Sequence, residues 1–207
     1  MLKAAKTIIA DSGKFANITT VRKETSLGEE AIQPVSRIVN AVGPVEDAEH
    51  PFFFYFATKP VTRKVRELKE CPFSTITWTE LCKGPSTPTG QLNALGIARP
   101  VPSGPAGDVL RERHWQPFWA NHYSKGPLDS PDYMLFEFVP YQLEFSSYDK
   151  DIAIGGPFSD TWEPFILRRL PAAASCSSGG SSSSENVEAL LSLIVQSPWV
   201  KANSFES

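Results

Sequence analysis

The run PFFFYFAT at residues 51–58 constrains the fold of this chain more than any other segment. It is apolar at odd and even positions alike, so a strand made from it must be buried on both faces. The sequence that follows, KPVTRKVRELKE, turns and then opens an amphipathic helix over 62–70. We therefore expect a buried strand that leads directly into a helix whose inward residues are Val65 and Leu68.

Strand-like segments dominate the rest of the first 150 residues. Runs rich in β-branched and aromatic residues alternate with polar turns, and only short helical segments lie between them. This order predicts a mainly β protein with short helices (β+α), an antiparallel barrel with appended helices, and argues against alternating βαβ units. The further expected strands are 15–22, 33–42, 73–81, 91–101 and one or two within 133–148, and the further expected helices are 2–15 and 108–123, the latter interrupted or kinked by Pro117.

The composition changes sharply after residue 170. The segment AAASCSSGGSSSS has almost nothing that can pack and is typical of a flexible linker. Beyond it, ENVEALLSLIV reads as a short amphipathic helix. We therefore expect one domain over 1–170, a Ser-rich flexible linker over 171–184, and a C-terminal helix and tail over 185–207.

Charge and cysteine usage exclude several classes of function. The net charge is −3 and the basic residues are interleaved with acids, so no nucleic-acid partner is expected. No apolar run reaches the roughly 18 residues of a membrane span, and the N-terminus has no signal-peptide pattern. The expected location is the cytoplasm, with a mitochondrial presequence at the basic N-terminus as the weaker alternative. The three cysteines and three histidines lack metal-binding spacing, so no metal site is expected.

Two hydroxyls and two cations meet where the buried strand passes into the helix. These are Thr58, Thr62, Arg63 and Lys64. Backbone N–H groups and the positive end of the helix dipole favour an anion at such a position, and an Arg fork adds bidentate hydrogen bonds. The segment is therefore a candidate phosphate cradle. The alternative is a solvated basic turn before an ordinary helix.

The same segment resembles a known family. Members of the flavin mononucleotide (FMN)-binding split-barrel family, which includes pyridoxamine 5′-phosphate oxidase and the general stress protein flavoproteins, carry a strand ending in Thr, then S-R-K, E-L and N-P. Here these elements read Thr58, Thr62-Arg63-Lys64, Glu67-Leu68 and Cys71-Pro72, with Thr for Ser and Cys for Asn. The resemblance extends from about residue 18 to residue 148, and the block 114–140 is more similar to the general stress protein branch.

The resemblance implies a fold, a cofactor and a set of contacts. The fold would be an FMN-binding split β-barrel, and the protein a homodimer with flavin sites at the subunit interface. No catalytic side chain is nominated, because in a flavoprotein the cofactor carries out the redox chemistry. The residues implied for the phosphate and ribityl chain are Arg37, Thr58, Thr62, Arg63 and Lys64, and those implied near the flavin ring are Val39, Ala57 and Gln91.

The function implied is that of an FMN-binding, oxidoreductase-like protein of the general stress protein type with an unknown substrate. Two alternatives stay open: a true pyridoxamine 5′-phosphate oxidase, and a non-catalytic flavin-binding or interaction module. The oxidase alternative is disfavoured because Ser146 and Ser147 stand where that enzyme carries a Trp, and its C-terminal R-x-H-D-R-type segment has no counterpart here.

Overall fold

A single antiparallel sheet organises the chain. The computed structural model describes residues 2–12, 15–24, 31–46, 51–79, 90–146, 165–169 and 184–202. Within these residues the strands are β1 (Phe15–Glu24), β2 (Ala31–Glu46), β3 (Pro51–Thr58), β4 (Phe73–Thr79), β5 (Gln91–Pro100), β6 (Met134–Ser146), β7 (Phe165–Arg168) and β8 (Val200–Ala202). The helices are α1 (Leu2–Asp11), α2 (Arg63–Glu70), α3 (Pro105–His114), the 3₁₀ helix η1 (Pro117–Asn121) and α4 (Ser184–Gln196).

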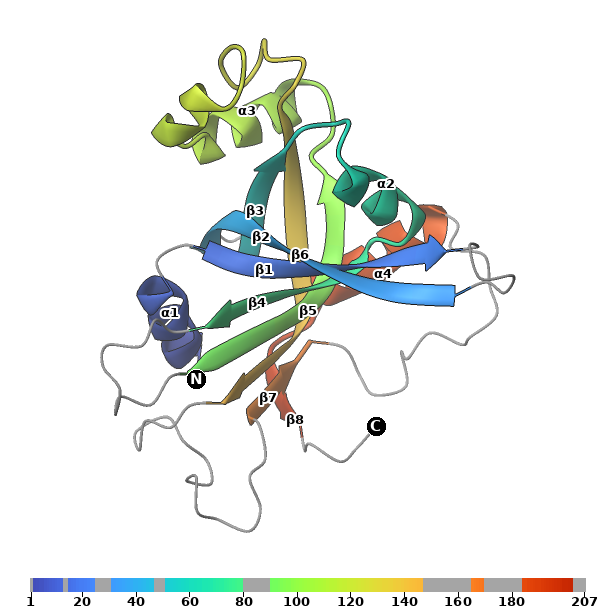
Figure 1. Ribbon diagram of the computed structural model, residues 1–207. Coiled ribbons are helices and arrows are strands. Elements are labelled where there is room, and N and C mark those ends of the chain that lie inside the picture. Colours follow the sequence, from blue (N-terminus) through green and yellow to red (C-terminus); the bar gives the residue numbers. More distant parts are fainter. Residues whose placement is uncertain are drawn as a thin grey trace, which may run out of the picture.

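The sheet closes on itself into a ring. Its strand order is β3-β2-β1-β4-β5-β6-β7-β8, and an additional pairing joins β3 to β6. Every pairing of neighbouring strands is antiparallel. Figure 1 shows the strands crossing around a common centre with the short helices outside them. The mainly β architecture that the sequence predicts is therefore confirmed.

Strand β6 is where the ring divides. Its first part pairs with β3, from Met134 opposite Thr58 to Phe138 opposite Phe54. Its second part pairs instead with β7 over residues 142–145, while β5 follows it along the other edge. A bulge between Leu95 and Gly96 accompanies this change, and a Cβ atom on Gly96 would lie 2.6 Å from the backbone oxygen of Val139. The glycine therefore permits the close approach of β5 to β6.

The interior of the ring is filled by large side chains, and two helices contribute to it. Phe54, Phe56, Trp78 and Phe138 are fully buried there. Helix α1 adds Ala5, Ile8 and Ile9, which share one face at i, i+3 and i+4 spacing, and α2 adds Val65 and Leu68. The two helices lie at opposite sides of the ring (Figure 1). Each helix packs one side against the core of the ring and turns the other side outward, so each has one apolar stripe.

A second core lies on the outer face of β3, β5 and β6. Phe53 and Tyr55 point to this side of β3, so the strand is buried on both faces as the sequence predicts. Leu191 and Ile194 of α4 pack there, and Arg99 links the sheet to the helix through ion pairs with Glu137 (2.8 Å) and Glu188 (2.9 Å). The C-terminal helix is therefore packed against the sheet.

The structure decides two expectations that the sequence left open. The helix expected over 108–123 is interrupted and forms two shorter pieces, α3 and η1, because Pro117 disfavours helical geometry at the preceding Gln116, which is extended. The segment 133–148 supplies one continuous strand, β6, to residue 146. The sequence analysis did not identify β7 and β8, which have four and three residues. Most of the polar loop or hairpin turn expected at 23–32, most of the loop expected at 82–90 and the linker up to residue 183 lie outside the described residues.

Candidate functional site

The hydroxyls of the candidate cradle meet at the junction of β3 and α2. Thr58 ends β3 and is buried, and its Oγ1 lies 3.1 Å from Oγ1 of Thr62. Thr62 is the N-cap residue of α2, yet its side chain makes no capping hydrogen bond. The first turn of α2 also contains no acidic residue. The helix N-terminus therefore has no anionic side chain of its own, which leaves the positive end of its dipole to an incoming anion.

Lys64 places a cation beside these hydroxyls. Although it is a lysine in the first turn of a short helix, its side chain is only 8% exposed, and its Nζ lies 5.4 Å from the centre of the Phe56 ring. Burial, together with the nearby positive charge of Arg37, lowers the pKa of Lys64 to about 8. Among the residues that the structure describes, no carboxylate pairs with this ammonium group. Buried charges are normally paired, so Lys64 is a site where an anion would be stabilised.

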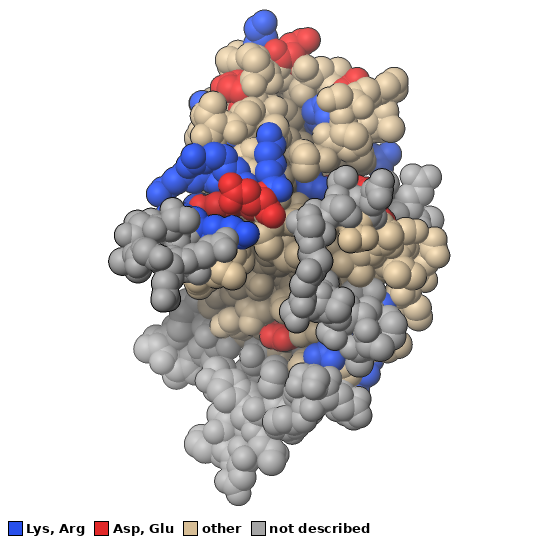
Figure 2. Space-filling model, turned by 90° about the vertical axis from the view of Figure 1, so that its right-hand side faces the viewer, with Lys and Arg blue, Asp and Glu red and all other residues tan. Residues whose placement is uncertain are grey.

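Arg37 is held by a carboxylate one turn further along α2. Its Nη2 atom lies 2.7 Å from Oε1 and 2.6 Å from Oε2 of Glu67, and its Nη1 atom donates to Oγ1 of Thr20 at 2.9 Å. The Thr20 hydroxyl donates to Glu67 at 2.6 Å, and Nε of Arg22 donates to the same carboxylate at 3.2 Å. Figure 2 shows basic and acidic side chains gathered on the face that carries α2.

Glu67 is the centre of this network, and sequence reasoning assigned it no role. Burial raises the pKa of Glu67, but the hydrogen bonds from Thr20, Arg37 and Arg22 outweigh that effect, so the net shift is downward. The carboxylate is therefore ionised at neutral pH. A signal was present in the sequence: Glu67 lies three residues after Lys64 and on the face of α2 that also carries Leu68. A charged residue on the buried face of a helix needs partners.

Of the remaining predicted residues, two lie beside the cradle, one lies at its edge, and Gln91 lies far from it. Val39 is buried two residues along β2 from Arg37, and Ala57 immediately precedes Thr58, so both lie beside the cradle. Arg63 is exposed at the first helical position of α2 and points to solvent, unlike its neighbour Lys64. The structure thus brings Arg37, Thr58, Thr62 and Lys64 together and leaves Arg63 at the edge.

Gln91 lies at the other end of the sheet within one chain. It starts β5 and is paired with Ser146, the last residue of β6, whereas Thr58 is paired with Met134, the first. Twelve residues of strand correspond to roughly 40 Å along β6. The exposed side chain of Gln91 donates to Asn93 at 3.0 Å. Gln91 and the cradle of the same chain are therefore too far apart to hold one small ligand.

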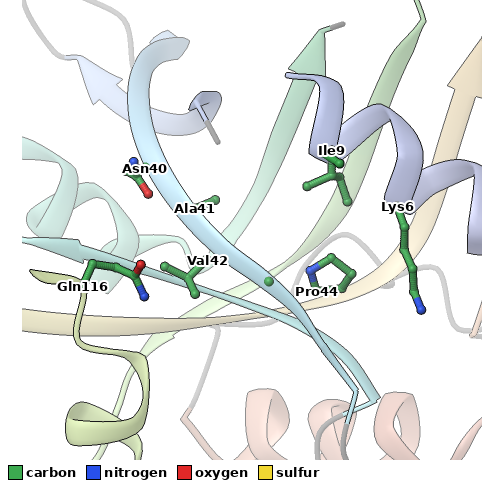
Figure 3. A pocket seen from close by; sticks show the side chains of 9 residues that line it. Lys6, Ile9, Asn40, Ala41, Val42, Pro44 and Gln116 are labelled. Carbon is green, nitrogen blue, oxygen red and sulfur yellow. The ribbon is translucent and has the colours of Figure 1, made fainter. Parts of the chain in front are cut away.

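Two cavities follow β2 beyond Arg37. The larger, about 470 Å³, lies between α1, β2 and the segment before η1, and is lined by Asn40, Val42, Pro44, Ile9, Lys6 and Gln116 among others (Figure 3). In the close-up the Gln116 amide points toward Val42. The smaller, about 310 Å³, is mostly aromatic and apolar, and its lining includes Phe15, Ile38, Val39, Phe118, Trp119 and Tyr123. Neither is lined by Lys64 or Thr58.

Neither a metal site nor a membrane-crossing helix is found among the described residues. No group of three His, Cys, Asp or Glu side chains there is placed to hold a metal ion. None of the helices in that part of the chain is both long enough and apolar enough to cross a membrane.

Comparison with known proteins links the chain to one fold. No family model matches the sequence, and no curated protein matches it. Among solved structures, the chain is similar to a pyridoxamine 5′-phosphate oxidase-related, FMN-binding protein from Nostoc punctiforme. The TM-score is 0.56 at 14% identity, over 97% of this chain and 95% of that one.

Two more similarities extend the range of related proteins. A protein related to general stress protein 26, of the pyridoxine-phosphate oxidase family, from Clostridium acetobutylicum gives a TM-score of 0.52 at 16% identity, over 72% of this chain and 94% of that one. A heme-binding protein from Mycobacterium smegmatis gives a TM-score of 0.50 at 17% identity, over 69% of this chain and 52% of that one. These similarities show the fold, so the resemblance to split-barrel proteins is confirmed at that level.

Proposed function

We propose that this protein binds a flavin phosphate, FMN, with the phosphate held between Lys64 and the hydroxyls of Thr58 and Thr62. The observation that carries the proposal is the burial of Lys64 without a carboxylate partner among the described residues. Keeping that ammonium charged with a pKa near 8 costs roughly 3 kcal/mol relative to water. A phosphate at the N-terminus of α2 would offset this cost, because it supplies the missing charge.

The residues present fit a phosphate monoester better than a neutral ligand. Arg37 is paired with the carboxylate of Glu67, whereas Lys64 beside it has no carboxylate partner among the described residues, so its positive charge is left for a ligand. A phosphate monoester brings a charge of about −1.5 to −2 at neutral pH. The ring of the flavin would lie against β2 beyond Arg37, where Val39 lies on the same face of the strand and borders the smaller cavity. About 7 Å of strand separates Arg37 from Val39, which the ribityl chain can span.

A second copy of the chain would complete the site. Phe15 and Ile38, on neighbouring strands β1 and β2, are 63% and 72% exposed, and Phe118 of η1 borders the same apolar cavity. Large apolar side chains grouped in this way mark an interaction surface. Gln91 of one chain lies far from that chain's own cradle, so in a homodimer it could serve only the partner's site.

A bound flavin would supply hydride or single-electron transfer. The chain's own part is to bind and orient that cofactor through Lys64, Thr58 and Thr62. Oxidoreductase activity toward a small molecule is the function we propose for the complete site. The substrate would enter from the aromatic cavity at Trp119 and Tyr123.

The absorption spectrum of the purified protein tests this proposal. We expect a yellow protein with flavin bands, and release of FMN on heating, identified by its mass. Protein that is purified without colour should become yellow and retain the flavin through gel filtration after incubation with FMN. Heme bands without flavin, or failure to retain FMN under any of these conditions, would contradict the proposal.

A further inference from the structure

The carboxylate of Glu67 is ion-paired with Arg37, a cation that a phosphate in this site would be expected to contact. Glu67 is 4% exposed, and it accepts hydrogen bonds from Thr20, Arg22 and Arg37. Both of its oxygens lie within 2.7 Å of Nη2 of Arg37. Glu67 follows Lys64 by one turn of α2, so Arg37 lies near that lysine, and its positive charge contributes to lowering the pKa of Lys64. The arginine is therefore close to the cradle and is already paired.

We infer that Glu67 is a specificity-determining residue that withholds Arg37 from the ligand phosphate and so limits the affinity of the cradle. The inference rests on the proposed function. Lys64 then provides the direct cation for the phosphate, while the pair of Arg37 and Glu67 remains intact in the complex.

The geometry of the network explains why the pair would persist. Arg37 donates hydrogen bonds to both Glu67 and Thr20, and Thr20 in turn donates to Glu67. Each of the three side chains is therefore hydrogen-bonded to the other two. Thr20 is fully buried. Moving Arg37 to a phosphate would leave Glu67 with fewer donors in a buried position, which is costly. Among the described residues, Lys64 has no carboxylate partner that it would have to leave in order to contact a phosphate.

The test is a double-mutant cycle on ligand affinity. FMN and riboflavin are titrated into the parent, Glu67→Gln, Arg37→Gln and the double variant. Glutamine keeps the shape and an acceptor for Thr20 but removes the charge, so Arg37 is released. We expect Glu67→Gln to bind FMN about tenfold more tightly, the scale of one new charge-assisted hydrogen bond, with riboflavin changed less than about threefold. In the Arg37→Gln background the same substitution should change FMN affinity by less than about threefold.

Each other outcome overturns the inference. Unchanged or weaker FMN binding by Glu67→Gln would show that the carboxylate does not compete, and equal weakening of FMN and riboflavin would show a purely structural role. An equal gain in both backgrounds would show that the effect does not pass through Arg37. A parent that binds neither flavin overturns the proposed function as well, whereas a parent that binds FMN confines the failure to this inference.

A crystal structure of the unmodified protein with FMN decides the point if Glu67→Gln does not fold. We expect Nζ of Lys64 to contact the phosphate, and the hydrogen bonds between Arg37 and Glu67 to remain. A guanidinium of Arg37 turned from Glu67 to the phosphate would overturn the inference.

Discussion

The ammonium group of Lys64 lies 5.4 Å from the centre of the Phe56 ring, between the end of β3 and the first turn of α2. Such a contact attracts a cation to an aromatic face, but it is weaker than an ion pair. The burial of Lys64 therefore lowers the stability of the ligand-free protein, and it does so at the place where an anion would remove the cost. Stability and binding should respond in opposite directions when this charge is removed.

Lys64→Met is expected to stabilise the ligand-free protein and to abolish most FMN binding. Methionine keeps the apolar stem and removes the buried charge, so the free energy of unfolding should rise by about 1–3 kcal/mol. FMN affinity should fall about ten- to a hundredfold, while riboflavin affinity changes little. Urea denaturation and flavin titration measure the two effects. Lys69→Met, an exposed lysine of the same helix, is the control and should alter neither.

FMN binding should weaken as the pH rises through about 8. The pKa of Lys64 is lowered to about 8 by burial in the ligand-free protein, and a bound phosphate would raise it. The protonated form binds, so affinity is full below pH 7 and falls by up to tenfold per pH unit between the free and bound pKa values. Riboflavin should show no such dependence. In Lys64→Arg, whose guanidinium stays charged, FMN affinity should be flat from pH 7 to 9; a parallel decline in that variant would contradict the assignment.

The ring of strands and the β3–α2 junction could be predicted because their signals are local. The run at 51–58 is apolar on both faces, and the structure places one face in each of two cores. The motif around Lys64 and the helix after it are formed by residues close together in the sequence, so the spacing of those residues was enough to predict them. Strands β7 and β8 are too short to carry a period, and their pairing depends on partners distant in the sequence.

The charge network could not be predicted in the same way. Arg37, Glu67 and Thr20 come from three elements, and their meeting is a consequence of the register of β1 on β2 and of the seating of α2. The sequence pattern implied a phosphate contact for Arg37, but it gave no means of identifying Glu67 as a partner of that arginine. It likewise treated Arg63 and Lys64 as equivalent, whereas helix geometry exposes one and buries the other.

Ile38→Asp is expected to convert a dimer into a monomer. The side chain is 72% exposed on the outer face of β2 beside the apolar cavity, and a carboxylate there would be buried unpaired in a contact between copies. Sedimentation velocity should show a dimer for the parent and a monomer of about 23 kDa for the variant. Leu128→Asp, an exposed leucine elsewhere, should remain dimeric. A parent that is monomeric at micromolar concentration with flavin bound would refute the proposed assembly.

Ile194→Ala should destabilise the protein by about 2–4 kcal/mol. Ile194 is fully buried in the outer core, so the substitution leaves a cavity between α4 and the sheet. Leu193→Ala, which removes an exposed side chain from the neighbouring position of the same helix, should cost less than about 0.5 kcal/mol. Equal effects in urea denaturation would show that α4 does not pack on the sheet in solution.

The affinity of the unmodified protein for FMN compared with riboflavin tests the central claim most directly. The two ligands share the ring and ribityl chain and differ only in the phosphate. Fluorescence titration at pH 7 should give a dissociation constant for FMN at least about tenfold lower than that for riboflavin, because one charge-assisted hydrogen bond to Lys64 is worth roughly 1.5–3 kcal/mol. Equal affinity for the two flavins, or binding of neither, would contradict the assignment of the β3–α2 junction as a phosphate site.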